Sequence, residues 1–402
     1  MTSGDGSASD LSRRAAQIEI SPTVAMAQKA AALRGMGRGP IDLTVGEPDL
    51  DTPHHIIDAA VDALNSGRTR YTASAGLSEL RAAVALRYRQ DSKVTFSADE
   101  VAITNGGKHA LFLVCQALLD RGDEVIIPSP HWPSFSEAVR LAGARPILVH
   151  THEQDGFQVT ARMISKATSP RTKAVIVNSP ANPTGAVVDA EDLLVIGDMA
   201  QRRRFTLLFD DAYARLLYRR VDPSVLQALR DSVSDRFVIL GTASKTYCMT
   251  GWRLGWVLAP KVLVDACAAL ASHSTQCPTS FVQVAAIQAL TGPQRAVQEM
   301  AAEYRQRRDF VLSALAAIPR VTCVEPGGGL YVFPNVARHL SPAMPSTSAM
   351  ALRLMEEAGL AVIPGEAFAA PGYIRISLAR PMPELTEGMR RLKAFLERQE
   401  NA

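Results

Sequence analysis

The strongest candidate for chemistry in this chain is Lys245, which follows an apolar run and several small residues. A lysine held in apolar surroundings gives up its proton more readily, and a neutral amine condenses with carbonyl groups to form Schiff bases. Arg253 lies eight residues further on, beside Gly251 and Trp252, and its planar guanidinium matches the oxygens of a phosphate group. Taken alone, Lys245 could equally be an ordinary surface lysine in a loop.

A second candidate is the segment 105–108, Asn-Gly-Gly-Lys, between an apolar run and a helical pattern. Backbone N–H groups at the positive end of a helix suit a phosphate group. The segment lacks the G-x-x-x-x-G-K-[ST] spacing of nucleotide-binding loops, and a plain tight turn is the alternative. Another glycine cluster, at 35–39, follows no apolar run and is interpreted as a loop.

Short apolar runs alternate with helix-length segments around these candidates. The runs are rich in Val, Ile and Leu, which is typical of strands buried on both faces of a mostly parallel sheet, and we expect them at 101–104, 124–127, 147–149, 174–178, 206–210 and 237–241. Helical segments such as 108–119 and 190–203 provide the crossovers that parallel strands need. Ligands bind beyond the carboxyl ends of such strands, where small, polar and aromatic residues gather here. The sequence therefore predicts one site at one edge of one sheet.

The character of the chain changes after about residue 292. We expect a long charged helix from Arg295 to about 318, followed by a hairpin-like glycine-rich stretch at 327–333, a helix at 348–358, a strand at 373–378 and a helix at 384–398. The predicted α/β organisation has four parts, namely a flexible tail (1–10), an N-terminal arm that is part of the small domain (11–50), a large domain (51–292) whose mostly parallel sheet is sandwiched by helices, and a small α+β domain (293–402).

Composition excludes several classes of protein. The 402 residues are 47% hydrophobic and 21% charged, which are globular values for two or three folding units. Lys and Arg total 43 against 40 Asp and Glu, so the charge indicates no nucleic-acid partner. No apolar run approaches the roughly 18 residues of a membrane span, and residues 1–10 lack the apolar core of a signal peptide. The five cysteines are scattered without a C-x-x-C motif, so we expect reduced thiols in a cytoplasmic protein and no metal site.

Five motifs give the chain a resemblance to a known family. In chain order they are VGEPD (45–49), YTASAG with ELR (71–76 and 79–81), NSPANPTG (178–185), SK through MTGWR (244–253) and YIRIS (373–377). Together they resemble the class I aminotransferases, pyridoxal-phosphate (PLP) enzymes of the aspartate aminotransferase fold, and especially their bacterial branch. The resemblance covers about residues 20–398. It implies PLP fold type I, in which a large PLP-binding domain joins a smaller α+β domain.

The resemblance implies catalytic roles for Lys245, Asp210 and Tyr213. Lys245 would form the Schiff base with PLP and afterwards carry the proton between the substrate's α-carbon and the cofactor. Asp210 would pair with the pyridine nitrogen and keep it protonated, which makes the ring an electron sink. Its spacing from Tyr213 selects Asp210 rather than Asp211 for this role.

Further matches surround the cofactor ring and its phosphate. Tyr213 and Asn182 match residues that hydrogen-bond the ring's phenolic oxygen, and Trp132 matches the aromatic residue stacked on the ring. Tyr71 resembles a tyrosine that the neighbouring subunit lends to the phosphate, so the resemblance implies a homodimer with shared active sites. The implied phosphate cradle consists of Gly106, Gly107, Lys108, Thr242, Ser244 and Arg253.

The resemblance also implies a substrate site. Arg375 would form a bidentate pair with the substrate's α-carboxylate, with Gly46 and Asn182 beside it and Trp132 against the substrate. Lys108, at the exit of the phosphate loop, matches a lysine that faces the second carboxylate of an acidic substrate in the aspartate-using branch. The alternative is that Lys108 only neutralises the phosphate or points to solvent.

Three departures from the family pattern lie near the expected substrate mouth. Asp211 and Ala212 stand where relatives usually carry Glu followed by Ile or Val, and His131 stands where a Tyr commonly precedes the Trp. The stretch 325–329 is also richer in glycine than usual. None of these removes a catalytic group, but they leave the side-chain specificity open.

The resulting functional hypothesis is PLP-dependent transamination between an amino acid, aspartate, glutamate or a related one, and a 2-oxo acid. The alternative is a PLP-dependent β/γ-elimination, γ-replacement or cyclisation, because these reactions also begin with loss of the substrate's α-proton and use the same motifs. A regulator built on the PLP fold is disfavoured, since Lys245 is present and no helix-turn-helix extension precedes the fold. Small amino acids and keto acids are the expected partners, with neither nucleic acid nor membrane.

Overall fold

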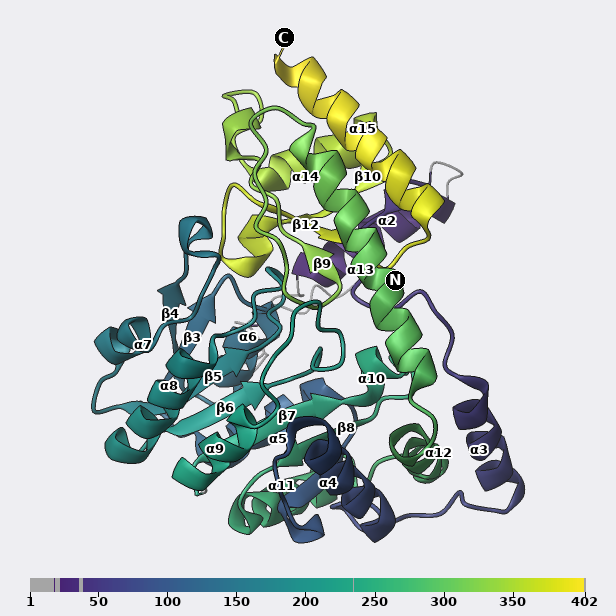
Figure 1. Cartoon of the computed structure of the whole chain (residues 1–402), viewed down its shortest axis with the longest axis vertical. Helices are drawn as coiled ribbons and strands as arrows, with labels where there is room; N and C mark the ends of the chain where they lie inside the picture. The colour runs from purple at the N-terminus through teal and green to yellow at the C-terminus, as the bar shows by residue number, and fades with distance from the viewer. Residues whose placement is uncertain (1–17, 19–21, 36–38, 234, 401–402) are drawn as a thin grey trace, which may run out of the picture.

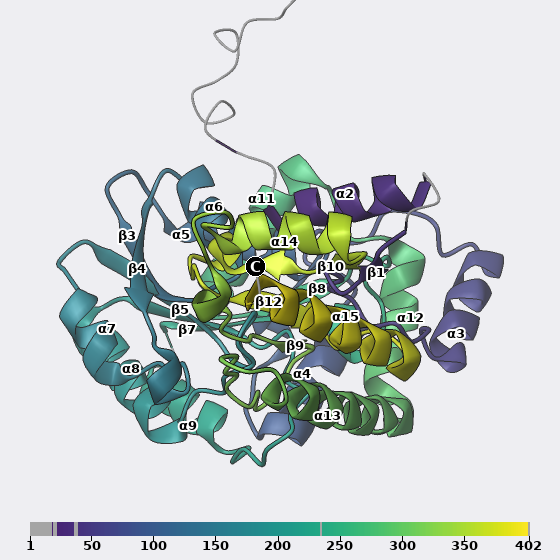
Figure 2. The same ribbon diagram turned by 90° about the horizontal axis from the view of Figure 1, so that it is seen from above.

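The computed structural model describes residues 18, 22–35, 39–233 and 235–400. The expected tail at 1–10, most of the following segment up to residue 21 and the centre of the 35–39 loop lie outside the described residues. The first described helix, α2, covers Pro22–Gly35. It packs through Met26, Ala30 and Leu33 against elements from the last part of the chain. Figures 1 and 2 both place α2 beside β10, far along the sequence.

A seven-stranded mixed sheet with the strand order β2-β8-β7-β6-β5-β3-β4 supports the site. Its central strands are parallel, and β8 runs antiparallel to both of its neighbours. The strands are β2 (Val101–Thr104), β3 (Glu124–Ser129), β4 (Arg145–His150), β5 (Thr172–Asn178), β6 (Thr206–Asp210), β7 (Phe237–Thr242) and β8 (Gly255–Leu258). The mostly parallel sheet predicted from the apolar runs is confirmed, and β8 is an element that the sequence analysis missed.

Helices cover both faces of this sheet (Figure 1). Successive strand residues point to opposite faces, so that Val175 and Leu207 join one apolar core and Ile176 and Leu208 join the other. One face packs against α5 (Gly107–Leu118), α6 (Pro133–Leu141) and α11 (Lys261–Ser274). The other packs against α4 (Ser78–Ser92), α7 (Ala161–Ala167), α8 (Ala190–Arg203), α9 (Val225–Ser232) and α12 (Ser280–Thr291), with α3 (His54–Asn65) against α12.

Two small sheets and three helices form a separate apolar core near the C-terminus. Strand β1 (Ile41–Asp42) pairs in parallel with β10 (Leu360–Ala361), while β11 (Ile363–Pro364), β12 (Ile374–Ser377) and β9 (Tyr331–Val332) form an antiparallel sheet. The helices are α13 (Arg295–Ala316), α14 (Thr347–Glu357) and α15 (Met382–Glu400). In Figure 1, α13 extends from beside α12 to the small sheets, where it lies against α15. The exact domain limits, 51–292 and 293–402, stay predictions.

The expected hairpin at 327–333 is wrong. Gly328 forms an isolated bridge with Leu217, and Tyr331–Val332 pairs with β12 rather than with a neighbouring strand. The glycines serve close packing instead, because a Cβ on Gly328 would lie 2.6 Å from the Leu216 carbonyl oxygen.

The remaining elements are short. The four-residue helix α10 (Ala243–Thr246) follows β7 directly, and the 3₁₀ turns are η2 (Ala98–Glu100), η3 (Glu153–Asp155), η4 (Ala337–His339) and η5 (Gly365–Phe368). Over the described part of the chain, no helix has the length and apolar character needed to cross a membrane.

Candidate active site

A cavity of about 880 Å³ lies at the carboxyl ends of the parallel strands, between the large sheet and the C-terminal layers. The last residues of three neighbouring strands line it, namely Asn178 of β5, Asp210 of β6 and Thr242 of β7. The opposite wall comes from residues that follow β1, from β12 and from α2. The cavity therefore occupies the sheet edge at which the sequence predicts a site.

Lys245 lies on α10 inside this cavity, and its Nζ donates a hydrogen bond to the Gly46 carbonyl oxygen. Burial, together with the positive charges of Arg375 and Arg253, lowers the pKa of Lys245 to about 8, and the negative charge of Glu47 opposes this shift. A lysine with this pKa holds a useful fraction of neutral amine near neutral pH, as a nucleophile or general base requires.

Asp210 supplies a buried carboxylate to the same cavity. Burial raises its pKa to about 6, while a hydrogen bond from the Ala212 N–H (3.0 Å) opposes the shift. The neighbouring Asp211 does not line this cavity but a second one, of about 440 Å³. There the Tyr88 hydroxyl donates to its Oδ1 at 2.9 Å, and burial raises the pKa of Asp211 to about 8.

The glycines before α5 bring backbone close to a guanidinium. Gly106 has a φ of 88°, and a Cβ there would lie 2.6 Å from Nη2 of Arg253. Helix α5 then begins at Gly107, where a Cβ would lie 3.2 Å from Cβ of Thr242. Free N–H groups at this helix start, the Arg253 guanidinium and the Ser244 hydroxyl gather at one end of the cavity. This combination matches a phosphate group.

Lys108 and Trp132 line the cavity beside that cradle. Nζ of Lys108 lies 5.1 Å from the centroid of the Trp132 ring, within the range of a cation–π contact. Burial and the charge of Arg253 lower the pKa of Lys108. A second anion, in addition to a phosphate, would offset this crowding of positive charge.

Arg375, on β12, is buried at the opposite side of the cavity. Its Nη1 donates to Oδ1 of Asn182 at 3.1 Å and its Nη2 donates to the Thr44 carbonyl oxygen at 2.7 Å. The guanidinium lies 4.1 Å from the centroid of the Tyr331 ring. Its buried Nε has no hydrogen-bond partner among the described residues, which suits an anionic ligand such as a carboxylate.

The structure thus brings most of the predicted residues together. Gly106 lies behind the cavity wall against Arg253, and Tyr71 lies apart with 84% of its surface exposed. The predicted residues that line the cavity are Gly46, Gly107, Lys108, Trp132, Asn182, Asp210, Tyr213, Thr242, Ser244, Lys245, Arg253 and Arg375.

The sequence analysis did not select two further residues that line the cavity, Tyr331 and Asn178. The Tyr331 hydroxyl lies 3.1 Å from that of Tyr213, at the cavity wall. Asn178 donates to the Asp210 carbonyl oxygen (3.1 Å) and accepts from the Asn182 N–H (2.8 Å). Asn178 opens the NSPANPTG motif and so had a sequence signal, whereas Tyr331 had only its place in the glycine-rich stretch.

Comparisons with known proteins agree with this arrangement. The family model "Aminotransferase class I and II" matches residues 38–392. An aspartate aminotransferase from Geobacillus stearothermophilus is 40% identical over 96% of this chain and 99% of its own length. An aspartate/prephenate aminotransferase from Thermus thermophilus is also 40% identical, over 96% of this chain.

Solved structures of aspartate aminotransferases have the same fold as this chain. The Thermus thermophilus aspartate aminotransferase with maleate superimposes with a TM-score of 0.91 at 39% identity, covering 96% of this chain and 99% of that one. The Rhizobium meliloti aspartate aminotransferase gives 0.92 at 35% identity, over 97% and 99%. On this fold, one cavity holds a buried lysine, a carboxylate and an arginine. The chain that forms this cavity belongs to the class I and II aminotransferases.

Proposed function

We propose that this aminotransferase uses PLP and that Lys245 binds it covalently. The main support for this proposal is that one cavity holds two buried groups, Lys245 with a lowered pKa and the carboxylate of Asp210. A phosphate cradle also lies at one end, where Gly106 packs so closely on Arg253 that a Cβ would fill the space. These residues fit an anionic, electron-poor pyridine ring.

When bound, PLP withdraws electrons from the substrate's α-carbon and so acidifies its proton. Arg375 and Asn182 bind and orient the substrate's α-carboxylate through the guanidinium fork. Once the substrate's amino group had replaced it at the cofactor, Nζ of Lys245 would be a neutral amine that could carry the proton between the substrate's α-carbon and the cofactor. Asp210 would support the positive charge of the pyridine nitrogen, and Tyr213 and Asn182 would hold the ring's phenolic oxygen.

Reduction with borohydride, followed by peptide mapping, tests the cofactor assignment. The pyridoxyl group should be found on Lys245, and Lys245→Ala should bind PLP only reversibly and lose turnover. A matched control is Lys261→Ala, an exposed lysine paired with Asp265 on α11. A pyridoxyl group on any other lysine would overturn the assignment.

We further infer that the preferred substrates include an acidic amino acid, with Lys108 as the partner of its distal carboxylate. Lys108 and Arg375 place positive charge at two separate walls of the cavity, as a dicarboxylate would need. The named relatives that support this are aspartate aminotransferases, and the Thermus thermophilus relative was solved with maleate, a dicarboxylate.

We also propose a cytoplasmic homodimer in which Tyr71 completes the phosphate site of the partner's cavity. Tyr71 is exposed and does not line the cavity of its own chain, and Val61 and Leu64 on the nearby α3 are exposed as well. All five cysteines are free thiols, which suits a reducing compartment. Tyr71→Ala and Lys245→Ala, inactive alone, should regain activity when their subunits are mixed and reassociated. A fully active monomer in sedimentation would contradict this.

A further inference from the structure

The segment 42–49 between β1 and the large domain, named the strap here, runs along one wall of the cavity. Two of its backbone carbonyl groups contact Lys245 and Arg375, two of the cations to which the proposed function gives roles. The Gly46 oxygen accepts from Nζ of Lys245, and the Thr44 oxygen accepts from Nη2 of Arg375 at 2.7 Å. A backbone acceptor can orient a flexible cation only if the backbone itself is fixed. The orientation of both cations therefore depends on the contacts that hold the two ends of the strap, which we call its anchors.

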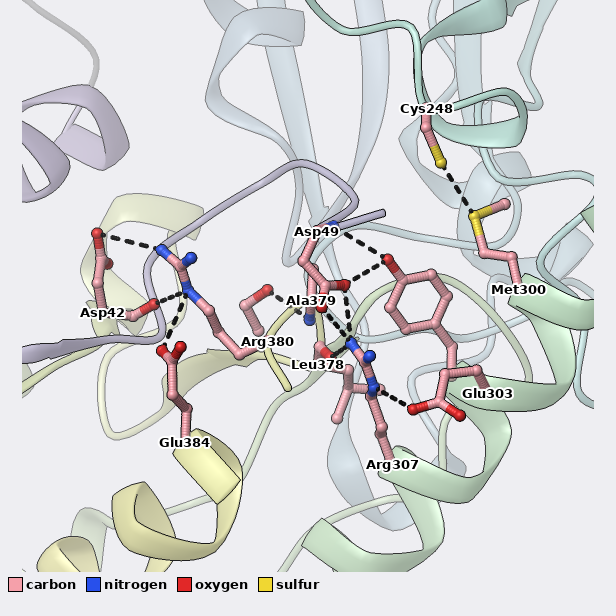
Figure 3. Close-up of polar contacts among 12 residues, drawn as sticks. Asp42, Asp49, Cys248, Met300, Glu303, Arg307, Leu378, Ala379, Arg380 and Glu384 are labelled. Carbon is pink, nitrogen blue, oxygen red and sulfur yellow. Dashed lines mark hydrogen bonds and ion pairs between the residues drawn. The ribbon is translucent and has the colours of Figure 1, made fainter. Parts of the chain in front are cut away.

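The first anchor is at Asp42. Nε of Arg380 donates to the Asp42 carbonyl oxygen at 2.9 Å, and its Nη2 lies 3.8 Å from the Asp42 carboxylate. The same carboxylate accepts from the Thr44 N–H at 3.0 Å, which folds the strap back on itself. Figure 3 shows Arg380 between Asp42 and Glu384.

The second anchor is at Asp49, where the strap meets α13 (Figure 3). Nη1 of Arg307 lies 2.7 and 2.9 Å from the two oxygens of Asp49, and the Tyr304 hydroxyl donates to the same carboxylate at 3.0 Å. Only 5% of the Arg307 side chain and 11% of the Asp49 side chain are exposed. Buried charges in such a pair depend on each other, because either one alone would remain desolvated and unpaired.

Arg307 also joins the strap to the strand that carries Arg375. Its Nη1 donates to the Leu378 carbonyl oxygen at 3.2 Å, just beyond the end of β12. Its Nε is held by Glu303 on the same helix at 2.9 Å. One guanidinium therefore fixes the strap, the end of β12 and α13 relative to one another.

We propose that Arg307 and Asp49 are positioning residues of the aminotransferase reaction, which hold the strap where its carbonyl groups orient the Lys245 amine and the Arg375 guanidinium. This rests on the roles proposed above for Lys245 and Arg375. Neither Arg307 nor Asp49 needs to touch the substrate, because each acts through the Gly46 and Thr44 carbonyl groups.

The charges around Lys245 give the proposal a direct readout. Glu47, on the strap, faces Lys245 as a negative charge, whereas Arg375, Arg253 and Lys108 face it as positive charges. Release of the strap takes the Gly46 acceptor away from Lys245 and changes both its burial and its distance from Glu47, so the pKa of Lys245 should shift from its wild-type value. A contact between Glu47 and the Thr250 hydroxyl (2.6 Å) also holds the strap, so the release is partial.

The experiment compares Arg307→Met with Arg308→Met. Arg308 is a matched control on the same helix, since 9% of its side chain is exposed and its partners are Asp309, Glu325 and the Pro326 carbonyl oxygen rather than the strap. In the cofactor-free protein, acylation of Lys245 by acetic anhydride, measured by mass spectrometry against pH, reports the Lys245 pKa. PLP-loaded enzyme gives kcat and KM with an amino-acid substrate.

Arg307→Met should shift the midpoint of Lys245 acylation by about one pH unit and lower kcat about tenfold to a hundredfold. Arg308→Met should keep the wild-type midpoint and a kcat within about twofold of wild type, even if it lowers the melting temperature. Equal effects of the two variants on both quantities would overturn the proposal and leave Arg307 a purely structural residue.

Two further variants keep the test decisive if Arg307→Met does not fold. Arg307→Lys keeps the charge opposite Asp49, so its acylation midpoint and kcat should lie close to the wild-type values. Asp49→Asn should show the same shifted midpoint and lowered kcat as Arg307→Met. Wild-type behaviour of Asp49→Asn would contradict the proposal. The proposed function fails separately, through an active Lys245→Ala enzyme, whatever the acylation midpoints are.

Discussion

Asp210 and Asp211 are adjacent in the chain, yet Asp210 lines the active-site cavity and Asp211 accepts a hydrogen bond from Tyr88 (2.9 Å) beside a different cavity. The cause is the strand geometry, in which successive residues point to opposite sides. Two identical side chains thus have different surroundings at the end of β6.

The first prediction follows from this separation. Asp210→Asn should lose most of the rate while PLP still binds, because an amide cannot stabilise the charged pyridine nitrogen. Asp211→Asn should keep most of the rate at neutral pH. Steady-state kinetics of both variants, together with their PLP content, checks this. The opposite ranking would show that the wrong member of the pair was chosen.

The second prediction concerns how the stability of the Asp211→Asn variant and of the wild-type protein depends on pH. Burial raises the pKa of Asp211 to about 8 from an ordinary value of 3.8, so the folded state keeps this proton after the unfolded state has lost it. The stabilisation linked to that proton should therefore decline as pH rises from about 4 to 8. The melting temperature of Asp211→Asn, compared with that of wild type, should improve steadily across this range. A difference that does not vary with pH would contradict the assigned burial.

The third prediction tests the phosphate cradle. Gly106→Ala places a Cβ 2.6 Å from Nη2 of Arg253 at a φ of 88°, so it should displace the guanidinium and weaken PLP binding at least about tenfold. Gly122→Ala is the control, because it has a φ of 101° with nothing within 4 Å of the added Cβ. Both variants should lose about 1 kcal/mol of stability from backbone strain. Equal PLP affinities in the two proteins would place the phosphate elsewhere.

The fourth prediction tests the acidic substrate. A hydrogen bond to a charged group contributes about 1.5–3 kcal/mol, so Lys108→Ala should lower kcat/KM for aspartate about ten- to a hundredfold. Alanine has no distal carboxylate, and its kcat/KM should barely change. A similar loss for both amino acids would assign Lys108 to the cofactor phosphate.

The sequence predicted the sheet well because strands buried on both faces must be continuously apolar, as in β5 and β6. Strand β8 was missed because its four residues begin only two positions after Arg253, and a short apolar run of that kind has no period of its own. The position of Lys245 and Asp210 at the edge of the sheet could be predicted because each follows an apolar run that is close to it in the sequence. The contacts of Tyr331 with Tyr213 and of Arg307 with Asp49 could not be predicted, since each joins residues more than a hundred positions apart in the sequence.

The most direct test of the account is a single turnover of the PLP-loaded enzyme with aspartate and no keto acid. Absorbance should show conversion of the bound cofactor to its pyridoxamine form, with one oxaloacetate released per active site, and added 2-oxoglutarate should restore the starting spectrum with formation of glutamate. Lys245→Ala should show neither change. Loss of aspartate to ammonia or another product without any pyridoxamine form would contradict transamination as the reaction of this site.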